Sequence, residues 1–314
     1  MNTSIKPFIA AVGGKSKLAK QILEEFPDHI DLYIEPFLGG GSILFEVLQK
    51  YKPKYVIAND KNSSIINVFS ILAYGGESQY EIFIHALNQL ERVFNRFETD
   101  KERSEFYYRI RNSFNETKEL CKEIIHNPSR DIFNDTEKNN AAILKWGAQF
   151  IFLNKTSFNS LYRENKKGEY NTPFGQKKSA SFDYYNLNAC RTLFQNGSTS
   201  IIFMSGDYKL VEYWIETFEY EKILSDLGSA LCYIDPPYMN TFNRYVNAET
   251  FDQVELANFC DMLRTKYGIK IVQSNSYIPE FFETHYADYT LIELDSMQSF
   301  HRSKVKEYLI KSKD

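Results

Sequence analysis

The sequence predicts an α/β fold: a doubly wound, mostly parallel, Rossmann-like sheet with an inserted, mainly helical domain. Two observations lead to this prediction. Short apolar runs alternate with helical patterns at both ends of the chain, which is the order of parallel βαβ units. Between these two parts, residues 77–120 and 141–153 read as successive helices. We therefore expect a discontinuous catalytic domain from residues 1–74 and 195–314 and a second domain from residues 75–194.

The N-terminal part begins the sheet. Residues 32–34 and 54–58 are short apolar runs that predict strands. Residues 42–51 and 63–72 carry the helical pattern that follows each of them. This order of strand, helix, strand, helix implies parallel neighbours in one sheet.

The rest of the chain continues the pattern after an interruption. The polar run 134–140 predicts a loop. Residues 155–181 are rich in Asn, Gly, Lys and aromatic residues, and they are too long for a passive connection, so we expect a binding segment there. The sheet then resumes, with strands expected at residues 200–204, 230–234, 269–273 and 289–294.

The composition is ordinary for a soluble globular protein, with 43% hydrophobic and 25% charged residues. Aromatic residues reach 16%, so we expect some of them outside the core as base-stacking surfaces. The sequence starts without an apolar leader and has no apolar run of membrane length, which predicts a cytoplasmic protein with no membrane partner. Four scattered cysteines lack metal-ligand spacing and predict buried thiols, with no metal site.

The charge distribution is more informative than the net charge. A net charge of −4 weighs mildly against a nucleic-acid partner. Residues 155–178, however, contain six basic and two acidic side chains, interleaved with aromatics and glycine. A second basic stretch covers residues 302–313. Each stretch is either a solvated face or part of a surface for nucleic acid.

The tetrapeptide Asp235-Pro236-Pro237-Tyr238 follows the expected strand 230–234. It therefore lies at the carboxyl end of a strand, where open α/β sheets bind their ligands. Two prolines make this loop stiff and extended. A carboxylate and a backbone carbonyl can each accept one N–H of an adenine amine, and the tyrosine ring can stack on a flipped base. The alternative is a plain Pro-Pro turn that ends the strand.

A glycine-rich turn, residues 35–42, follows the first expected strand. It fits neither the dinucleotide nor the phosphate-loop pattern, so a ligand without phosphate, such as S-adenosylmethionine, suits it better. Asp60 follows the second strand at the position of a ribose-binding acid; the alternative is a helix N-cap. The cofactor candidates of the turn are Glu35, Pro36, Phe37 and Gly39.

Two further candidates lie near other strands. Gly13-Gly14-Lys15-Ser16 is not a phosphate loop, because Ile9 occupies the position of the first glycine. Lys15 either reaches a carboxylate or simply lies in a turn that starts a helix. Asp207 and Tyr208 follow the strand 200–204 and can offer a carboxylate to the adenine amine and a ring for stacking.

The order Gly-Gly-Lys, Phe-x-Gly-Gly-Gly, an inserted region and Asp-Pro-Pro-Tyr resembles the Dam-type DNA adenine-N6 methyltransferases, the α-ordered D12 class. Residues 155–163 and 166–175 are very similar to that family's recognition segment, and Ser274-Asn275 and residues 304–310 fit the family as well. The resemblance covers nearly the whole chain.

The resemblance implies a methyl transfer from S-adenosylmethionine to an adenine flipped out of double-stranded DNA. It implies that Asp235 and Tyr238 engage the base and that Arg163 reads a guanine, with a phosphate contact as the alternative. We expect Lys166 and Lys167 to bind phosphates. We also expect a monomer, either solitary or paired with a restriction endonuclease that acts on the same site without direct contact. The implied cofactor residues are Ala11, Lys15, the 35–41 turn, Asp60, Asp207, Tyr208 and Asp235, and the implied DNA-facing residues are Phe158, Asn159, Leu161 and Arg163.

Two positions depart from the family pattern. Ala11-Val12 stand where the family usually has an aromatic residue, and Ser160 stands where it usually has glycine. Other readings remain: a cytosine-N4 methyltransferase, although Asp235 replaces its usual serine; an RNA or protein methyltransferase; and a DNA-binding regulator with an inactive methyltransferase fold. The recognition sequence is open, with GATC and other GA-containing sites as candidates.

Overall fold

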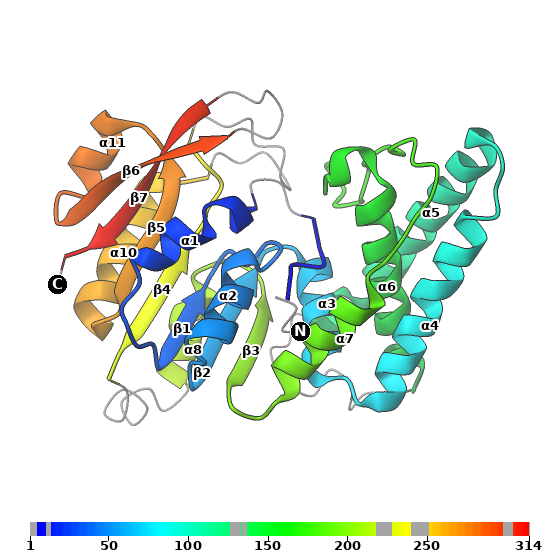
Figure 1. The fold of residues 1–314 in the computed structure, drawn as a ribbon, viewed down its shortest axis with the longest axis horizontal. Coiled ribbons are helices and arrows are strands. Elements are labelled where there is room, and N and C mark those ends of the chain that lie inside the picture. The colour runs from blue at the N-terminus through cyan, green and yellow to red at the C-terminus, as the bar shows by residue number, and fades with distance from the viewer. Residues whose placement is uncertain are drawn as a thin grey trace.

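The computed structural model describes residues 5–10, 14–125, 133, 137–217, 228–239, 251–297 and 304–313. Within these residues, seven strands form one sheet in the order β3-β2-β1-β4-β5-β7-β6 (Figure 1). β7 runs antiparallel to both of its neighbours, and the other strands run parallel to one another. This confirms the predicted α/β fold with a mostly parallel sheet. The strands are β1 Leu32–Glu35, β2 Tyr55–Asp60, β3 Ser200–Ser205, β4 Ala230–Ile234, β5 Lys270–Ser276, β6 Tyr289–Met297 and β7 Lys304–Ser312.

Helices cover both faces of the sheet, and this explains the uninterrupted apolar strands. Every residue of β1 and β4 is buried, because a parallel strand in the middle of such a sheet faces a hydrophobic layer on each side. Neighbouring residues of β1 point to opposite layers: Tyr33 joins one core cluster and Ile34 the other. The helices of this part are η1 Lys15–Lys17, α1 Ala19–Glu24, α2 Ser42–Lys50, α3 Ser63–Tyr74, α8 Leu210–Thr217, α10 Gln253–Tyr267 and α11 Pro279–His285.

A helical region is inserted between β2 and β3 and lies beside the sheet (Figure 1). Its α6 packs on α3, α4 and α5. Gly147 permits this close approach, because a Cβ there would lie 2.5 Å from Cδ1 of Ile71. The helical region thus shares one hydrophobic cluster with a face of the sheet. Its elements are α4 Glu77–Phe94, α5 Asp100–Ile125, α6 Glu137–Thr156, η2 Phe158–Ser160 and α7 Tyr184–Gln195.

One predicted element was wrong in part. Residues 137–140 belong to α6 rather than to a loop, because their apolar continuation packs as one helix on α3. Residues 134–136 of that expected loop lie outside the described residues. The expected domain boundaries, 1–74 with 195–314 and 75–194, stay a prediction.

The extended residues 5–10 are bonded to helices far away in the sequence. The side-chain amide of Asn154 accepts the N–H of Ala10 at 3.0 Å and donates to its carbonyl at 2.8 Å. Asn186 bonds in the same way to both backbone groups of Lys6. These side chains take the place of a neighbouring strand, and residues 5–10 therefore lie in a fixed position between the sheet and the helical region (Figure 1). No described helix is long and apolar enough to cross a membrane.

Candidate active site

The carboxyl ends of β1 and β4 lie side by side where the strand order reverses, which is where open α/β sheets bind ligands. Asp235 directly follows β4, and its Oδ1 lies 3.0 Å from Nζ of Lys15. The Lys15 side chain is 7% exposed and that of Asp235 is 22% exposed, so solvent screens this ion pair only partly. The expectation that Lys15 reaches a carboxylate is confirmed; Lys15 is also the first residue of η1.

The ring of Tyr238 lies next to this ion pair. Its hydroxyl donates to Oε2 of Glu307 at 2.6 Å, and Nζ of Lys15 lies 4.7 Å from its ring centroid. Glu307 belongs to β7, and its Oε2 is 4.0 Å from the same Nζ. The sequence analysis did not select Glu307. Its strand alternates basic and apolar residues, and only the sheet order shows that Glu307 faces the end of β4.

The two prolines of the tetrapeptide differ in their surroundings. The Pro237 carbonyl accepts a hydrogen bond from Nε2 of Gln253 at 2.7 Å, and Gln253 accepts in turn from Nδ2 of Asn275 at 3.1 Å. Among the described residues, no donor reaches the carbonyl of Pro236. Gln253 and Asn275 therefore hold the loop through the carbonyl of Pro237 and not through that of Pro236.

Four carboxyl groups influence one another at this edge of the sheet. Burial raises the pKa of Asp235, while the adjacent Lys15 lowers it and the charge of Glu307 adds to the increase. Burial raises the pKa of Glu35 well above its usual range, and the charges of Asp235 and Asp60 act in the same direction. The hydroxyl of Tyr33 donates to Glu35 at 2.7 Å and opposes this shift. The edge is thus an acidic environment that contains one buried ammonium group.

Asp60 joins the glycine-rich turn to the end of β2. Its Oδ2 accepts the N–H of Gly39 at 2.7 Å and its Oδ1 accepts the N–H of Asn62 at 2.8 Å. Burial raises the pKa of Asp60, and these two N–H groups oppose the shift. The N-cap of α3 is Asn62, whose side chain accepts from Ser64, so Asp60 is not the capping residue. Gly41 has φ of +71°, a backbone conformation that favours glycine in this turn.

The candidates Pro36, Phe37, Asp207 and Tyr208 lie around the same turn. Asn59 donates to the carbonyls of Pro36 and Gly206 and so connects the ends of β1 and β3. The rings of Phe37 and Tyr208 stack with centroids 5.3 Å apart. Tyr208 is only 6% exposed, so it supports Phe37 more than it offers a free face, whereas the side chain of Asp207 is exposed. Ala11 lies outside the described residues.

The recognition segment, residues 155–175, lies at the top of the helical region in Figure 1, on the same side as the carboxyl ends of the parallel strands. Phe158 is 51% exposed, Asn159 is exposed, and Leu161 is half-buried. Ser160, where the family usually has glycine, adopts φ of +54°, as does Asn159. The departure at Ser160 therefore leaves the left-handed turn in place and adds backbone strain.

A short hairpin follows this turn. Glu164 pairs with Tyr170, and Nε of Arg163 donates to Oδ1 of Asn171 at 2.8 Å. Within the described residues, no partner contacts the two terminal nitrogens of the exposed Arg163. Lys166 and Lys167 are exposed at the tip of the hairpin.

The base of the hairpin rests on the long helix α5. Nζ of Lys118 bonds to the carboxylate of Glu164 and donates to the carbonyl of Gly168 at 2.9 Å. The amide of Asn115 bonds to both backbone groups of Tyr170. The hairpin thus presents Arg163 and the two lysines from a fixed base.

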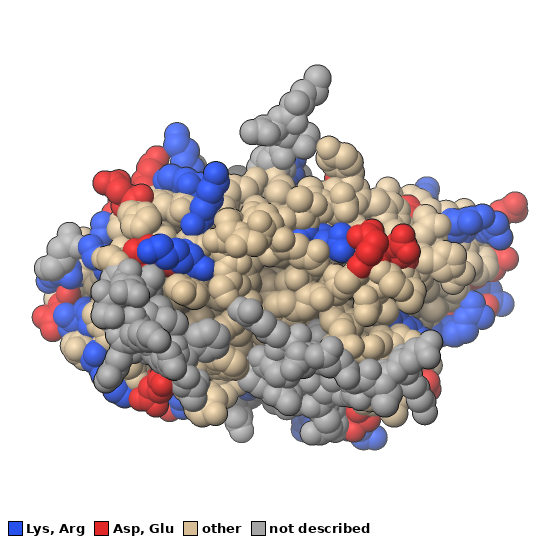
Figure 2. Space-filling model, turned by 90° about the horizontal axis from the view of Figure 1, so that it is seen from below, with Lys and Arg blue, Asp and Glu red and all other residues tan. Residues whose placement is uncertain are grey.

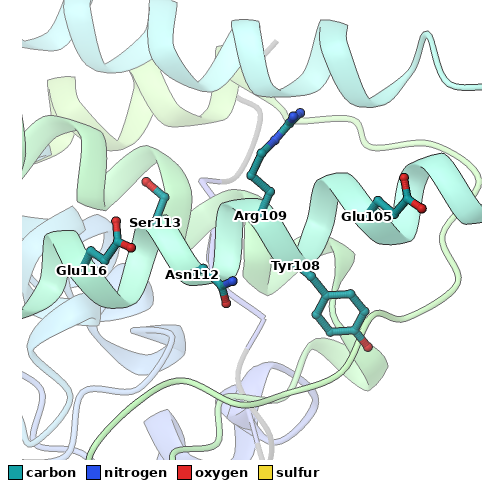
Figure 3. Close-up of a pocket in the computed structure, with 6 residues that line it drawn as sticks. All are labelled: Glu105, Tyr108, Arg109, Asn112, Ser113 and Glu116. Atoms are coloured by element: carbon teal, nitrogen blue, oxygen red, sulfur yellow. The ribbon is translucent and has the colours of Figure 1, made fainter.

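Two other surfaces lack this convergence of groups. Figure 2 views the face opposite the strand carboxyl ends; where described residues are visible, basic and acidic side chains are interspersed and no continuous basic stripe crosses it. Figure 3 shows an open depression of about 560 Å³ along one face of α5. It belongs to the helical region (Figure 1), and none of the residues that meet at Asp235 lines it. Its lining residues are Glu105, Tyr108, Arg109, Asn112, Ser113 and Glu116.

Comparison with known proteins agrees with this geometry. Residues 12–300 match the model of the D12 class N6 adenine-specific DNA methyltransferases. The chain belongs to this family, and it is therefore an adenine-specific DNA methyltransferase, an activity that implies S-adenosylmethionine as the methyl donor.

Individual relatives cover most of the chain. The type II methyltransferase M.MjaIII of Methanocaldococcus jannaschii is 34% identical over 91% of this chain and 90% of its own length. The type II methyltransferase M1.LlaDCHI of Lactococcus lactis is 26% identical over 98% of this chain and 95% of its own length. The DNA adenine methylase of Haemophilus influenzae is 28% identical over 86% of this chain and 79% of its own length.

Proposed function

We propose that this methyltransferase modifies the N6 amine of an adenine that is flipped out of duplex DNA, within a site that contains GA. The observation that carries the proposal is the position of Asp235. It lies at the carboxyl end of β4, is paired with a buried ammonium group, and is followed by a proline carbonyl with no described donor. Two acceptors in this arrangement suit the two N–H groups of one exocyclic amine.

The residues around the glycine-rich turn fit S-adenosylmethionine. The acidic groups Glu35, Asp60 and Asp235 favour a sulfonium cation and disfavour a phosphate-bearing cofactor. Asp60 would accept hydrogen bonds from ribose hydroxyls, and Phe37 offers an aromatic ring supported by Tyr208. When bound, the cofactor supplies an electrophilic methyl group.

The residues of the chain then orient the amine. Asp235 and the Pro236 carbonyl accept hydrogen bonds from its two N–H groups, which favours a tetrahedral nitrogen with its lone pair directed at the methyl carbon. A cofactor held at the glycine-rich turn would offer its methyl group to this lone pair, which Asp235 and the Pro236 carbonyl direct toward it. One N6 proton then departs through Asp235 to water. Tyr238 stacks on the base during this step.

Target choice is assigned to the recognition segment. Arg163 donates through Nε to Asn171, which orients its guanidinium plane and directs the terminal nitrogens outward. Two parallel donors match O6 and N7 of guanine. Lys166 and Lys167 at the hairpin tip contact phosphates, and Phe158 and Asn159 lie against the duplex.

Incubation of the purified protein with labelled S-adenosylmethionine and genomic DNA, followed by sequencing of methylated adenines, tests the proposal. Methyl groups on adenine N6 within one short GA-containing motif are the expected result. Incorporation into cytosine, into RNA only, or into no nucleic acid would contradict it. The names of the relatives include type II methyltransferases and DNA adenine methylases, and they support both a restriction–modification role and a solitary role. Protection of the modified DNA from endonucleases of known site separates these two roles.

A further inference from the structure

Glu307 approaches the active site from a strand that runs opposite to the others. β7 is antiparallel, so its first residues reach the same edge of the sheet as the carboxyl ends of β4 and β5. Glu307 pairs in register with Ser276, the last residue of β5. Its side chain is only 16% exposed, and a carboxylate so far out of water needs specific partners.

Two described partners of Glu307 lie beside Asp235. The hydroxyl of Tyr238 donates to its Oε2 at 2.6 Å, and Nζ of Lys15 lies 4.0 Å from the same oxygen. Lys15 also lies 3.0 Å from Asp235 and 4.7 Å from the centroid of the Tyr238 ring. One ammonium group is therefore shared between two carboxylates and covers one face of the tyrosine.

We propose that Glu307 is a positioning residue for methyl transfer, acting through Tyr238 and Lys15; the inference rests on the proposed function of Asp235 and Tyr238. The hydrogen bond from the phenol fixes the orientation of the ring, so a flipped adenine stacks on the face opposite Lys15. The second carboxylate also draws the ammonium group away from an exclusive pair with Asp235. Asp235 thus keeps lone pairs for the amine of the base.

Four variants test this role: E307A, E307Q, Y238F and the double variant E307A/Y238F. Glutamine can still accept the phenol hydrogen bond but carries no charge, whereas alanine removes both. We expect E307A to reduce the single-turnover rate by about tenfold or more, as for the loss of a charged hydrogen bond. In the Y238F background, the further loss should stay below about threefold, because the two groups act as a unit.

A fluorescent base provides the readout that a merely structural role would not change. With 2-aminopurine at the target position, E307A should alter the fluorescence of the flipped base and E307Q should restore most of the native signal. E293Q is the matched control: Glu293 lies on the neighbouring β6, exposed and paired with Lys306. It should match the native protein in rate and fluorescence. E307M, which fills the space without accepting a hydrogen bond, replaces E307A if alanine prevents folding.

The outcomes separate the two claims. A native protein that transfers no methyl group to DNA would contradict the proposed function itself. An active native protein whose E307A or E307M variant stays within about twofold of its rate would overturn only the role of Glu307. Full additivity of E307A and Y238F would overturn the route through Tyr238.

Discussion

The strand-end site and the recognition segment are built in different ways. At the end of β4, the tetrapeptide is fixed by its own prolines and by bonds to neighbouring elements, such as the bond from Gln253 of α10 to Pro237. The recognition segment has no strand of its own and takes its shape from side chains of other helices, such as Lys118 and Asn115. This difference teaches that the chemistry of the site is set by local sequence and sheet order. The shape of residues 155–175 depends instead on contacts with residues far away in the sequence.

The largest effect is expected at Asp235. Asp235→Ala should lower the single-turnover rate by roughly 100- to 1000-fold, because the amine loses a preorganised acceptor. DNA affinity should change little, since the recognition segment is untouched. A rate within about tenfold of that of the native protein would contradict the proposal that Asp235 takes part in methyl transfer.

The pH dependence of the same step follows from the raised pKa of Asp235. Only the ionised carboxylate accepts both the ammonium and the amine, so the rate should rise as pH increases through this pKa. The apparent pKa of the acidic limb of the pH–rate profile should therefore lie above the usual pKa range of an aspartic acid. Single-turnover rates are measured across pH. An apparent pKa at or below the usual range would contradict the claim that burial raises the pKa of Asp235.

The next largest effect concerns the cofactor. Asp60→Ala should raise the dissociation constant of S-adenosylmethionine at least about tenfold, because a charged hydrogen bond contributes roughly 1.5–3 kcal/mol. Asp28→Ala, at an exposed aspartate before β1, is the control and should bind S-adenosylmethionine as the native protein does. Calorimetry that finds equal affinity for both variants would limit Asp60 to its structural bonds with Gly39 and Asn62.

Arg163→Ala tests the recognition segment directly. The substitution should weaken the free energy of binding to the cognate duplex by about 1–3 kcal/mol and reduce discrimination at one base pair. Lys166→Ala should instead weaken binding to all duplexes alike. It should also reduce the slope of log affinity against log salt concentration by about one. Binding is measured on cognate and singly substituted duplexes at several salt concentrations. An equal loss on every duplex for Arg163→Ala would make it a phosphate contact.

The smallest effect is expected at Ser160. Ser160→Gly should stabilise the protein by roughly 1 kcal/mol, because φ of +54° is strained for serine and free for glycine. Asn159→Gly should gain less, since asparagine tolerates this conformation. Thermal unfolding of the two variants gives the comparison. A loss of stability in Ser160→Gly would show that the hydroxyl has a compensating contact.

The sequence predicted the position of Asp235 at the end of a strand, because the signals for it are local. Asp235 follows an apolar run that can only be a buried strand, and its two prolines exclude a helix. Asp60 was found by its distance from the glycine-rich turn. The role of Glu307 could not be predicted from the sequence, because its position depends on β7 lying between β5 and β6 in the sheet. No local pattern encodes that strand order. Asn154 and Lys118 could not be predicted for the same reason: their partners lie far along the chain.

The pairing of Lys15 with residues of β4 and β7 has a consequence for the order of folding. The ammonium group comes from near the start of the chain, whereas Asp235 and Glu307 are made late in synthesis. Residues 5–10 likewise cannot take their final position until Asn154 and Asn186 have been made. Contacts of such sequence separation form slowly, since a long loop must close first. The contacts of Lys15 with Asp235 and Glu307 can therefore form only after the chain that carries β4 and β7 has been synthesised.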